Sequence, residues 1–502
     1  MNRLEVGMVI DGYRLEEKLH KGGMAMLWRV SRVDPGNAGD AASQTPLLMK
    51  IPILGDHNDP AAIVGFEVEQ MIMPKLTGIH VPHYVAAGDF TGQPYIVMEL
   101  IAGKSLRSRF DEAPLPIDEV VEIGIKVATA LHDLHRQHVI HLDIKPSNIM
   151  FRPTGEAILI DYGLARHDKL PDLLAEEFRL PMGTGPYISP EQVLHMRNDP
   201  RSDLFALGVL LYHLATGERP YGFPTSISGL RRRLYRDAVP PRSLNPAIPP
   251  WLQEIILRCL EVNPNKRHDT TAQLAFELQN PDQVKLTERA AKRVRNGFFK
   301  LVRRWFRAMG MEPVPQQSAA EQLTRAPIIM VAIDLAYGSE ALAESLRVAS
   351  RRILQTEPGA RLACVTVQKT NRIGMDEYVD KQGNNIHVKH LVGLKHWARP
   401  LSIPPEKITY HVLEAPDPAS AIVDYAKVNA VDHIVIGSRG SSAFRRYLGS
   451  VSSQVVAQAD CTVTVVKSTG GSANAAAPVS PPEAIPSPSS QESAGVSAET
   501  TH

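Results

Sequence analysis

Cysteine is scarce in this 502-residue sequence, and the three cysteines, Cys259, Cys364 and Cys461, are far apart and form no Cys-x-x-Cys pair. This argues against both a disulfide framework and a zinc site. The sequence also lacks an apolar run long enough to span a bilayer, and its first residues lack the apolar core of a signal peptide. We therefore expect a soluble protein of the reducing cytoplasm.

An excess of charge of either sign is also missing. The chain has 55 lysines and arginines against 54 aspartates and glutamates. Global electrostatics therefore give no reason to expect nucleic acid as a partner. Hydrophobic residues make up 43% of the chain, which is enough to build several cores, and the length predicts about two to four domains.

Residues 10–280 read as one domain with two unlike parts. Strand patterns dominate up to about residue 110, with one amphipathic helix expected over 61–76, and helical patterns dominate from 117 onward. A helix over 204–216 is expected to end at Gly217. The sequence thus predicts a small β-rich lobe followed by a larger helical lobe.

Residues 281–325 form a basic connector. Apolar residues such as Phe298, Leu301 and Trp305 recur at helical spacing between arginines and lysines. Such a helix packs its apolar side on a neighbouring domain, which is the interpretation we favour. The alternative is peripheral contact with an anionic membrane.

The rest of the chain divides into two segments. Residues 326–467 alternate between strands and helices, which predicts an α/β domain with a parallel sheet. Residues 468–502 are rich in Ser, Pro and Ala, with few large apolar residues, and are predicted to be a disordered tail.

Two short motifs carry the chemistry. The first is His141-Leu142-Asp143-Ile144-Lys145-Pro146-Ser147-Asn148, and the second is Asp161-Tyr162-Gly163. In phosphate transfer from a nucleotide, Asp143 would take the proton of the acceptor hydroxyl and Lys145 would neutralise charge on the phosphoryl group. Asn148 and Asp161 would hold Mg²⁺, or Mn²⁺ in its place, on the phosphates. The pattern resembles bacterial serine/threonine protein kinases, and Lys145 is the serine/threonine form.

That resemblance implies a two-lobed kinase fold over 10–280 and a set of further site residues. Lys50 is expected to grip the phosphates of ATP, with Glu69 as its partner and Glu67 as the rival. Two further contacts are expected to be structural rather than chemical. Glu191 should pair with Arg267, and Asp203 should anchor the catalytic loop. The expected nucleotide contacts are Gly22, Gly23 and Leu27 over the phosphates, and Met98, Glu99 and Ile101 at the adenine.

Three departures from the family pattern stand out. In the glycine-rich loop, His20 and Ala25 replace the first and third glycines, so that the loop is expected to be stiffer. Leu142 stands where the family often has an arginine that receives an activating phosphate. Residues 164–183 contain no Ser, Thr or Tyr to carry that phosphate. We therefore expect a kinase that is held active, or regulated, without phosphorylation of this segment.

The second domain resembles the universal stress protein family. Asp334 ends the first strand, and a glycine loop follows a later strand and leads into a helix, which is a pattern that presents backbone N–H groups to phosphate. The resemblance implies a second ATP site and a homodimer through residues 461–467. The alternative is a turn that merely joins strand to helix. The implied ATP contacts are Asp334, Gly437, Gly440, Gly449 and Ser450.

The sequence therefore predicts a multidomain protein serine/threonine kinase that uses ATP and Mg²⁺, fused to a nucleotide-sensing domain. The alternative is a pseudokinase scaffold that binds ATP with little catalysis, and the altered glycine loop favours it slightly. Lys50, Asp143, Asn148 and Asp161 favour the enzyme. The sequence does not identify the protein substrates or the signal.

Overall fold

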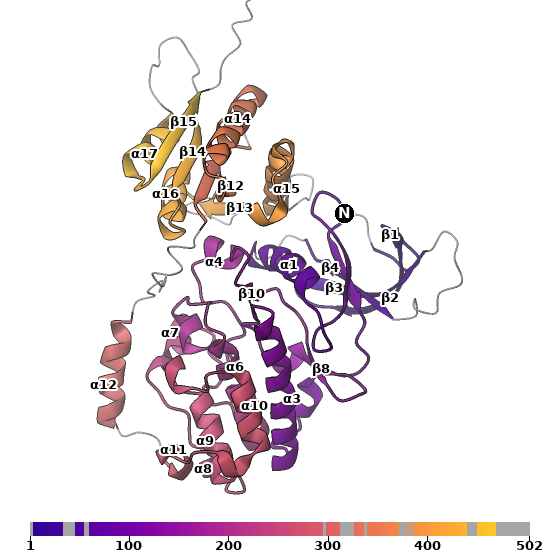
Figure 1. Ribbon diagram of the computed structural model, residues 1–502, viewed down its shortest axis with the longest axis vertical. Coiled ribbons are helices and arrows are strands. Elements are labelled where there is room, and N and C mark those ends of the chain that lie inside the picture. Colours follow the sequence, from indigo (N-terminus) through magenta and orange to yellow (C-terminus); the bar gives the residue numbers. More distant parts are fainter. Residues whose placement is uncertain are drawn as a thin grey trace, which may run out of the picture. The chain divides into compact units, whose positions relative to one another are not determined.

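The computed structural model describes residues 4–33, 46–54, 60–294, 298–311, 326–335, 339–370, 379–380, 385–438 and 449–467 (Figure 1). The predicted tail, and residues 312–325 of the predicted connector, lie outside the described residues. None of the helices in the described ranges combines the length and the apolar character that crossing a bilayer requires.

The small lobe is a six-stranded antiparallel sheet in the order β1-β2-β3-β4-β6-β5. Side chains alternate along β6, so that Tyr95 and Val97 join Leu15 and Trp28 on one face, and Ile96 turns to the other face. That second face belongs to the same apolar cluster as helix α1. The elements are β1 Val9–Ile10, β2 Tyr13–Lys21, β3 Ala25–Arg32, β4 Leu47–Pro52, α1 Pro60–Ile72, β5 Tyr84–Gly88 and β6 Tyr95–Glu99.

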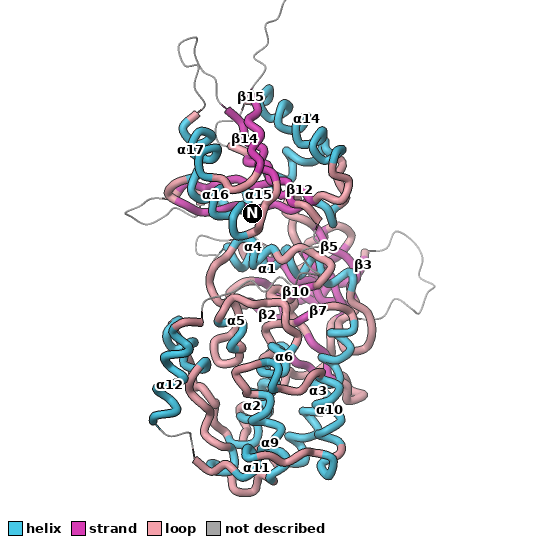
Figure 2. Tube along the Cα trace, turned by 60° about the vertical axis from the view of Figure 1, so that its left-hand side comes forward, coloured by secondary structure: helices cyan, strands magenta, loops and turns pink. Residues whose placement is uncertain are grey.

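The large lobe is built around helix α6, Arg201–Thr216, which is buried on nearly all sides. Helices α3, Ile117–Arg136, and α9, Pro250–Cys259, pack against it, and α10, Thr271–Gln279, packs in turn on α3 (Figure 2). Helix α6 ends where Gly217 adopts φ +76°, as the sequence predicted, because a left-handed residue stops a helix without strain only at glycine. The other elements are α2 Arg107–Phe110, β7 Val139–Ile140, β8 Ile149–Phe151, β9 Ala157–Leu159, β10 Arg166–His167, α4 Leu173–Glu177, α5 Pro190–Val193, α7 Ile227–Arg231 and α8 Pro241–Leu244.

The described part of the connector packs on this lobe. It holds α11, Glu288–Ala291, and α12, Phe298–Met309. Ala308 is buried in a cluster with Leu230 and Leu234, and Arg231 donates to the Ala308 carbonyl at 3.2 Å. Ala308 thus attaches α12 to the large lobe, but Phe299, Trp305 and Phe306 stay exposed, so the apolar side is packed only in part as the favoured interpretation expects.

The second domain is a five-stranded sheet in the order β13-β12-β11-β14-β15, parallel throughout. Its two faces belong to different apolar clusters, one shared with α16 and α17 and the other with α14 and α15. The predicted α/β architecture is confirmed, but helix α15 was not predicted. The elements are β11 Ile328–Ala332, α14 Glu340–Thr356, β12 Arg361–Lys369, α15 Ile386–Ala398, β13 Ile408–Ala415, α16 Pro418–Val428, β14 His433–Ser438, α17 Ser450–Gln458 and β15 Thr462–Lys467.

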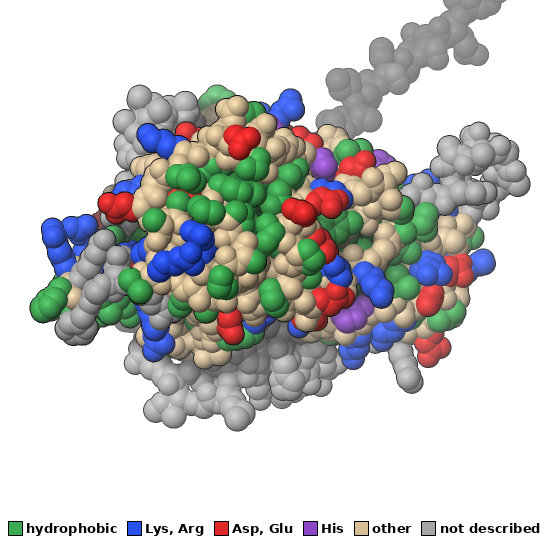
Figure 3. Space-filling model, turned by 90° about the horizontal axis from the view of Figure 1, so that it is seen from below, with side chains coloured by type: hydrophobic (Ala, Val, Ile, Leu, Met, Phe, Trp, Pro, Cys, Tyr) green, Lys and Arg blue, Asp and Glu red, His purple; other side chains and the backbone are tan. Residues whose placement is uncertain are grey.

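The surface agrees with the balanced composition. On the face shown in Figure 3, basic and acidic side chains are interspersed, with apolar side chains between them. This face therefore carries no field of a single sign of the kind that attracts nucleic acid.

Candidate active site

Lys50 of β4 lies between two carboxylates and contacts both. Its Nζ lies 2.6 Å from Oε2 of Glu69 on α1 and 2.9 Å from Oδ1 of Asp161. Of the two glutamates that the sequence offered, Lys50 meets Glu69. One strand, one helix and the loop after β9 therefore converge on a single ammonium group.

The electrostatics of this cluster keep Lys50 and Asp161 ionised, whereas burial raises the pKa of Glu69. Burial alone would lower the pKa of Lys50, but the Asp161 and Glu69 carboxylates outweigh this effect and raise it. Lys50 in turn lowers the pKa of Asp161 to about 2. The Asp161 side chain is still 44% exposed, so an ionised oxygen-rich group faces solvent beside the lysine.

The loop that begins at His141 is pinned by Asp203 of α6. The Asp203 carboxylate accepts from the backbone N–H groups of His141 and Leu142, each at 2.9 Å, and is completely buried. Leu142 has φ +61°, a conformation that costs a non-glycine residue about 1 kcal/mol or more. The buried carboxylate holds the loop in this strained form.

Asp143 is surrounded by donors. Lys145 Nζ lies 2.6 Å from its carboxylate, and Thr184 donates to the other carboxylate oxygen through its N–H at 3.0 Å and its hydroxyl at 2.7 Å. Asn148 donates from Nδ2 to the Asp143 carbonyl at 3.0 Å. The amide nitrogen of Asn148 therefore points inward, and its Oδ1 is the atom that can act as a metal ligand.

A glycine that the sequence analysis did not single out brings these parts together. A Cβ at Gly65 of α1 would lie 3.0 Å from the carbonyl oxygen of Gly163, and a Cβ at Gly163 would lie 3.3 Å from that of Gly65. Either would be tighter than ordinary van der Waals contact, so α1 and the Asp161 loop pack backbone to backbone. The sequence signal for this close packing was Gly65 itself, a glycine inside a predicted helix.

The glycine loop is the turn between β2 and β3. The Gly22 N–H donates to the Ala25 carbonyl at 2.9 Å, and a Cβ at Gly23 would meet no atom within 4 Å. The turn itself therefore does not require glycine at position 23. Leu27 of β3 lies opposite Lys50 in the strand register, so the turn and the lysine belong to neighbouring strands.

The predicted adenine segment lies at the end of β6. Met98 is paired within the sheet with Leu48, and Ile101 is buried just beyond the strand. The Glu99 side chain accepts from Arg152 at 2.9 Å, and this hydrogen bond lowers the pKa of Glu99. Arg152 thus engages the Glu99 side chain, and the backbone is the part of Glu99 that the prediction assigns to the nucleotide.

The scaffold pair of the large lobe is buried. Arg267 donates to the two carboxylate oxygens of Glu191 at 2.6 and 2.8 Å, and both side chains are at most 1% exposed. Ser189 begins α5 with a reciprocal cap in which its hydroxyl accepts from the Gln192 N–H. Neither contact touches Asp143 or Lys50, so this pair supports the site from a distance.

In the second domain, the predicted ATP residues are only partly brought together. Asp334 follows β11, and Gly437 lies in the neighbouring parallel strand β14, so both lie towards the carboxyl edge of the sheet. A Cβ at Gly437 would lie 3.0 Å from a methyl of Leu342, so packing alone explains this glycine. Gly449 caps α17, which begins at Ser450, and Gly440 lies outside the described residues.

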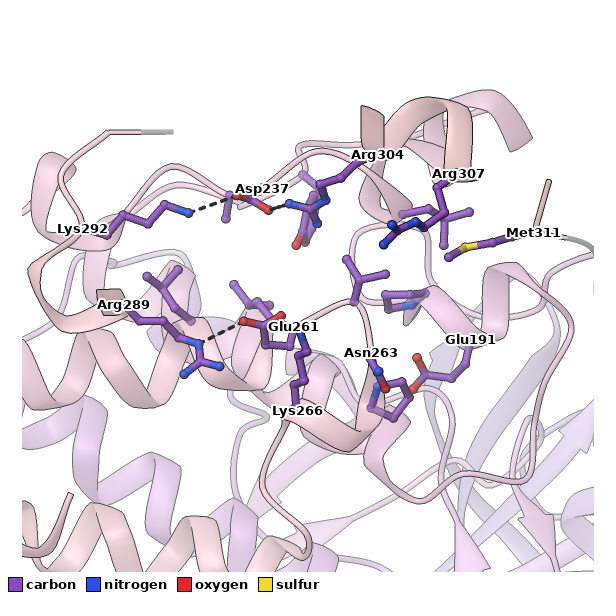
Figure 4. Close-up of a pocket in the computed structure, with 18 of the residues that line it drawn as sticks. Glu191, Asp237, Glu261, Asn263, Lys266, Arg289, Lys292, Arg304, Arg307 and Met311 are labelled. Carbon is purple, nitrogen blue, oxygen red and sulfur yellow. Dashed lines mark hydrogen bonds and ion pairs between the residues drawn. The ribbon is translucent and has the colours of Figure 1, made fainter. Parts of the chain in front are cut away.

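A cavity of about 1290 Å³ lies on the large lobe and contains none of the predicted catalytic or nucleotide-binding residues. Figure 4 shows Lys292 and Arg304 reaching Asp237 from two sides, and Arg289 reaching Glu261 at 3.0 Å. All three basic residues come from the connector. The polar groups of this cavity thus serve mainly to attach the connector to the lobe.

Comparison with known proteins gives two family matches. Residues 63–278 match the protein kinase domain, and residues 327–467 match the universal stress protein family. The first match begins within α1, so Lys50 and the glycine loop lie outside it.

Curated relatives align with this chain over about 277 residues. A probable serine/threonine-protein kinase of Clostridium acetobutylicum is 28% identical over 55% of this chain and 41% of its own length. Serine/threonine-protein kinase PknB of Mycobacterium leprae is 30% identical over 53% of this chain and 42% of its own. Serine/threonine-protein kinase PknL of Mycobacterium tuberculosis is 28% identical over 55% of this chain and 67% of its own length. The chain thus spans about two fifths of the length of the first two.

Proposed function

We propose that this chain, which joins a protein kinase domain to a universal stress protein domain, is an ATP-dependent protein serine/threonine kinase. The observation that carries the proposal is the meeting of Lys50, Glu69 and Asp161 beside the Asp143 loop. Residues more than 100 positions apart form the charge pattern that transfer of a phosphoryl group to a hydroxyl requires.

The described residues supply the roles that this reaction needs. Asp143 orients the acceptor hydroxyl of a Ser or Thr and takes its proton. Lys145, 2.6 Å from that carboxylate, offsets negative charge on the phosphoryl group. Lys50, fixed by Glu69, holds the phosphates of ATP in position. The backbone at Glu99 and Ile101 receives the adenine, and Gly22 and Gly23 admit the phosphates.

The donor set beside Lys50 fits a hard divalent cation. The Asp161 carboxylate is ionised and partly exposed, and Asn148 offers its amide oxygen. Carboxylate and amide oxygens together with phosphate oxygens are the ligands that Mg²⁺ prefers. Asn148 and Asp161 would hold Mg²⁺, or Mn²⁺ in its place, which when bound neutralises charge on the phosphates. The reaction belongs in the cytoplasm, where ATP is available.

The proposal is tested by transfer of labelled phosphate from ATP to a Ser/Thr peptide. Lys50→Met is expected to lower kcat/KM by about a hundredfold, because one charged donor to the phosphates is lost. Lys18→Met, an exposed change on β2, is the matched control and should leave the rate unchanged.

The alternative function, a pseudokinase scaffold that binds ATP, draws support from the altered glycine loop. It makes a different prediction for the same assay. Equal, negligible transfer by the wild type and Lys50→Met, with ATP binding intact in the wild type, would establish the scaffold instead of the enzyme.

We also propose that the second domain binds ATP through Asp334, Gly440, Gly449 and Ser450. Support comes from Asp334 at the carboxyl edge of a parallel sheet and from Gly449 at the start of α17. Equilibrium dialysis of the full chain should then give two nucleotides per chain. A stoichiometry of one, retained when Lys50 is replaced by Met, would locate binding in the second domain alone.

Two partner surfaces complete the proposal. Strand β15 lies at the edge of its sheet and carries Val463 and Val465, so a second copy can pair through residues 461–467. Sedimentation at several protein concentrations tests this pairing.

The second surface is on α12, where Phe299 and Phe306 are 90% and 62% exposed among basic residues. This supports peripheral contact with an anionic membrane, which sedimentation with phosphatidylserine vesicles tests.

A further inference from the structure

The acidic end of α4 is buried against the second domain. The Glu176 carboxylate accepts from the Arg361 guanidinium at 2.7 and 3.2 Å and from the Tyr425 hydroxyl at 3.2 Å. Asn429 donates to the backbone carbonyl of Glu176 at 3.2 Å. Helix α4 belongs to the segment 164–183, so the segment that the family controls by phosphorylation is held here by the neighbouring domain.

Two histidines extend this contact. His411 of β13 is completely buried, 3.1 Å from Glu176 and 3.6 Å from Glu177, and His387 of α15 lies 3.7 Å from Glu177. Burial opposes the charge on His411, but the two carboxylates outweigh it and raise the pKa of His411 to about 9. Burial likewise opposes ionisation of Glu176, but Arg361 and His411 lower its pKa to about 2. The contact between His411 and Glu176 therefore joins two charged side chains at neutral pH.

A second contact reaches α1. Lys395 of α15 lies 2.8 Å from Glu67, and both side chains are largely buried, at 17% and 11% exposed. Glu67 stands two positions before Glu69, and two helical positions differ by about 200°. The same helix therefore presents one glutamate to Lys50 in the site and another, on its opposite side, to the second domain.

Resting on the kinase function proposed above, we propose that the second domain holds the kinase in its active arrangement by binding the 164–183 segment and α1. Arg361 and His411 fix the 164–183 segment, and Lys395 fixes α1. In the family pattern, an arginine beside the catalytic aspartate binds a phosphate on this segment. Here Leu142 occupies that position, the carboxyl groups of Glu176 and Glu177 replace the phosphate, and the cations come from the second domain.

These cations are positioning residues, because they act on α4 and α1 and touch no reacting atom. Removing one partner of a buried pair leaves the other charge uncompensated, so the docked arrangement should be strongly disfavoured when a pair is broken. A reversed pair, by contrast, keeps the attraction. This difference separates a specific contact from general damage to the fold.

The test reverses the Lys395–Glu67 pair in the full chain. Lys395→Glu should lower kcat for a Ser/Thr peptide by between about 5- and 150-fold with little change in KM, because α1 is displaced and the peptide contacts are not. Adding Glu67→Lys should restore most of the loss. Hydrogen exchange of residues 60–72 and 173–177 should rise in the single variant and fall again in the double variant.

The matched control is Lys389→Glu on the same helix, where the lysine is 59% exposed and bonds Asp380 of its own domain. It should change neither the rate nor the exchange. Lys395→Ala is a milder second variant in case the charge reversal prevents folding, and it should shift both readouts in the same direction.

The two readouts separate this inference from the kinase function. If the wild type transfers phosphate and Lys395→Glu stays within twofold of it, the inference is overturned and the kinase function stands. If the wild type transfers none, but exchange responds reversibly to the charge reversal, the kinase function falls and the docking contact stands. No response in exchange overturns the contact as well.

Discussion

Replacing Asp143 with asparagine is expected to lower the rate of phosphate transfer by about 10²- to 10⁴-fold, the range for losing a general base. The amide keeps the size of the side chain and can still accept from the Thr184 hydroxyl, which lies 2.7 Å from the carboxylate. It cannot take the proton of the substrate hydroxyl. Steady-state transfer of label to a Ser/Thr peptide, with ATP saturating, measures the loss.

Asp168→Asn is the matched control for this substitution. Asp168 lies on the same lobe, with 51% of its side chain exposed. The control should transfer phosphate like the wild type, and both variants should unfold at the wild-type temperature. An Asp143→Asn variant within tenfold of the wild type would show that another group takes the proton.

The second large effect is on stability. Arg267→Ala should lower the free energy of unfolding by about 3–5 kcal/mol, because Glu191 would keep a charge in a site that is 1% exposed. The substitution also removes donors to the carbonyls of Glu261 and Arg201. Urea unfolding followed by circular dichroism measures the change, provided that the transition is two-state.

An exposed ion pair provides the comparison. Arg107 and Asp111 have side chains that are 63% and 60% exposed, so Arg107→Ala should cost less than about 1 kcal/mol. Equal costs for the two substitutions would mean that the Glu191–Arg267 pair contributes no more than a surface contact. The double variant Glu191→Gln, Arg267→Met should recover part of the loss, since no unpaired charge then remains buried.

Features that depend on neighbouring residues or on periodicity could be predicted from the sequence. The parallel sheet of the second domain followed from alternating strand and helix patterns, and α6 ended at Gly217 as expected. Glu69 was predicted as the partner of Lys50, with Glu67 as the rival, because a helix places both glutamates at fixed positions. The choice between them depended on how α1 is rotated, which its neighbours determine.

Features that depend on distant contacts could not be predicted. Helix α15 was missed because one of its faces carries His387 and Lys395, which are buried against carboxylates of the kinase part and so interrupt the apolar pattern. Glu176 and Arg361 lie 185 residues apart, and no local pattern relates them. The sequence therefore showed the carboxylates of the 164–183 segment, but not that Glu176 and Glu177 meet groups of the second domain.

The two glutamates on opposite sides of α1 have a thermodynamic consequence. If the helix couples the ATP cleft to the second domain, the coupling must be reciprocal. A nucleotide that tightens the Lys50–Glu69 pair would strengthen the Lys395–Glu67 contact by some factor, and whatever favours that contact would raise the affinity for the nucleotide by the same factor. Each domain would then report the occupancy of the other.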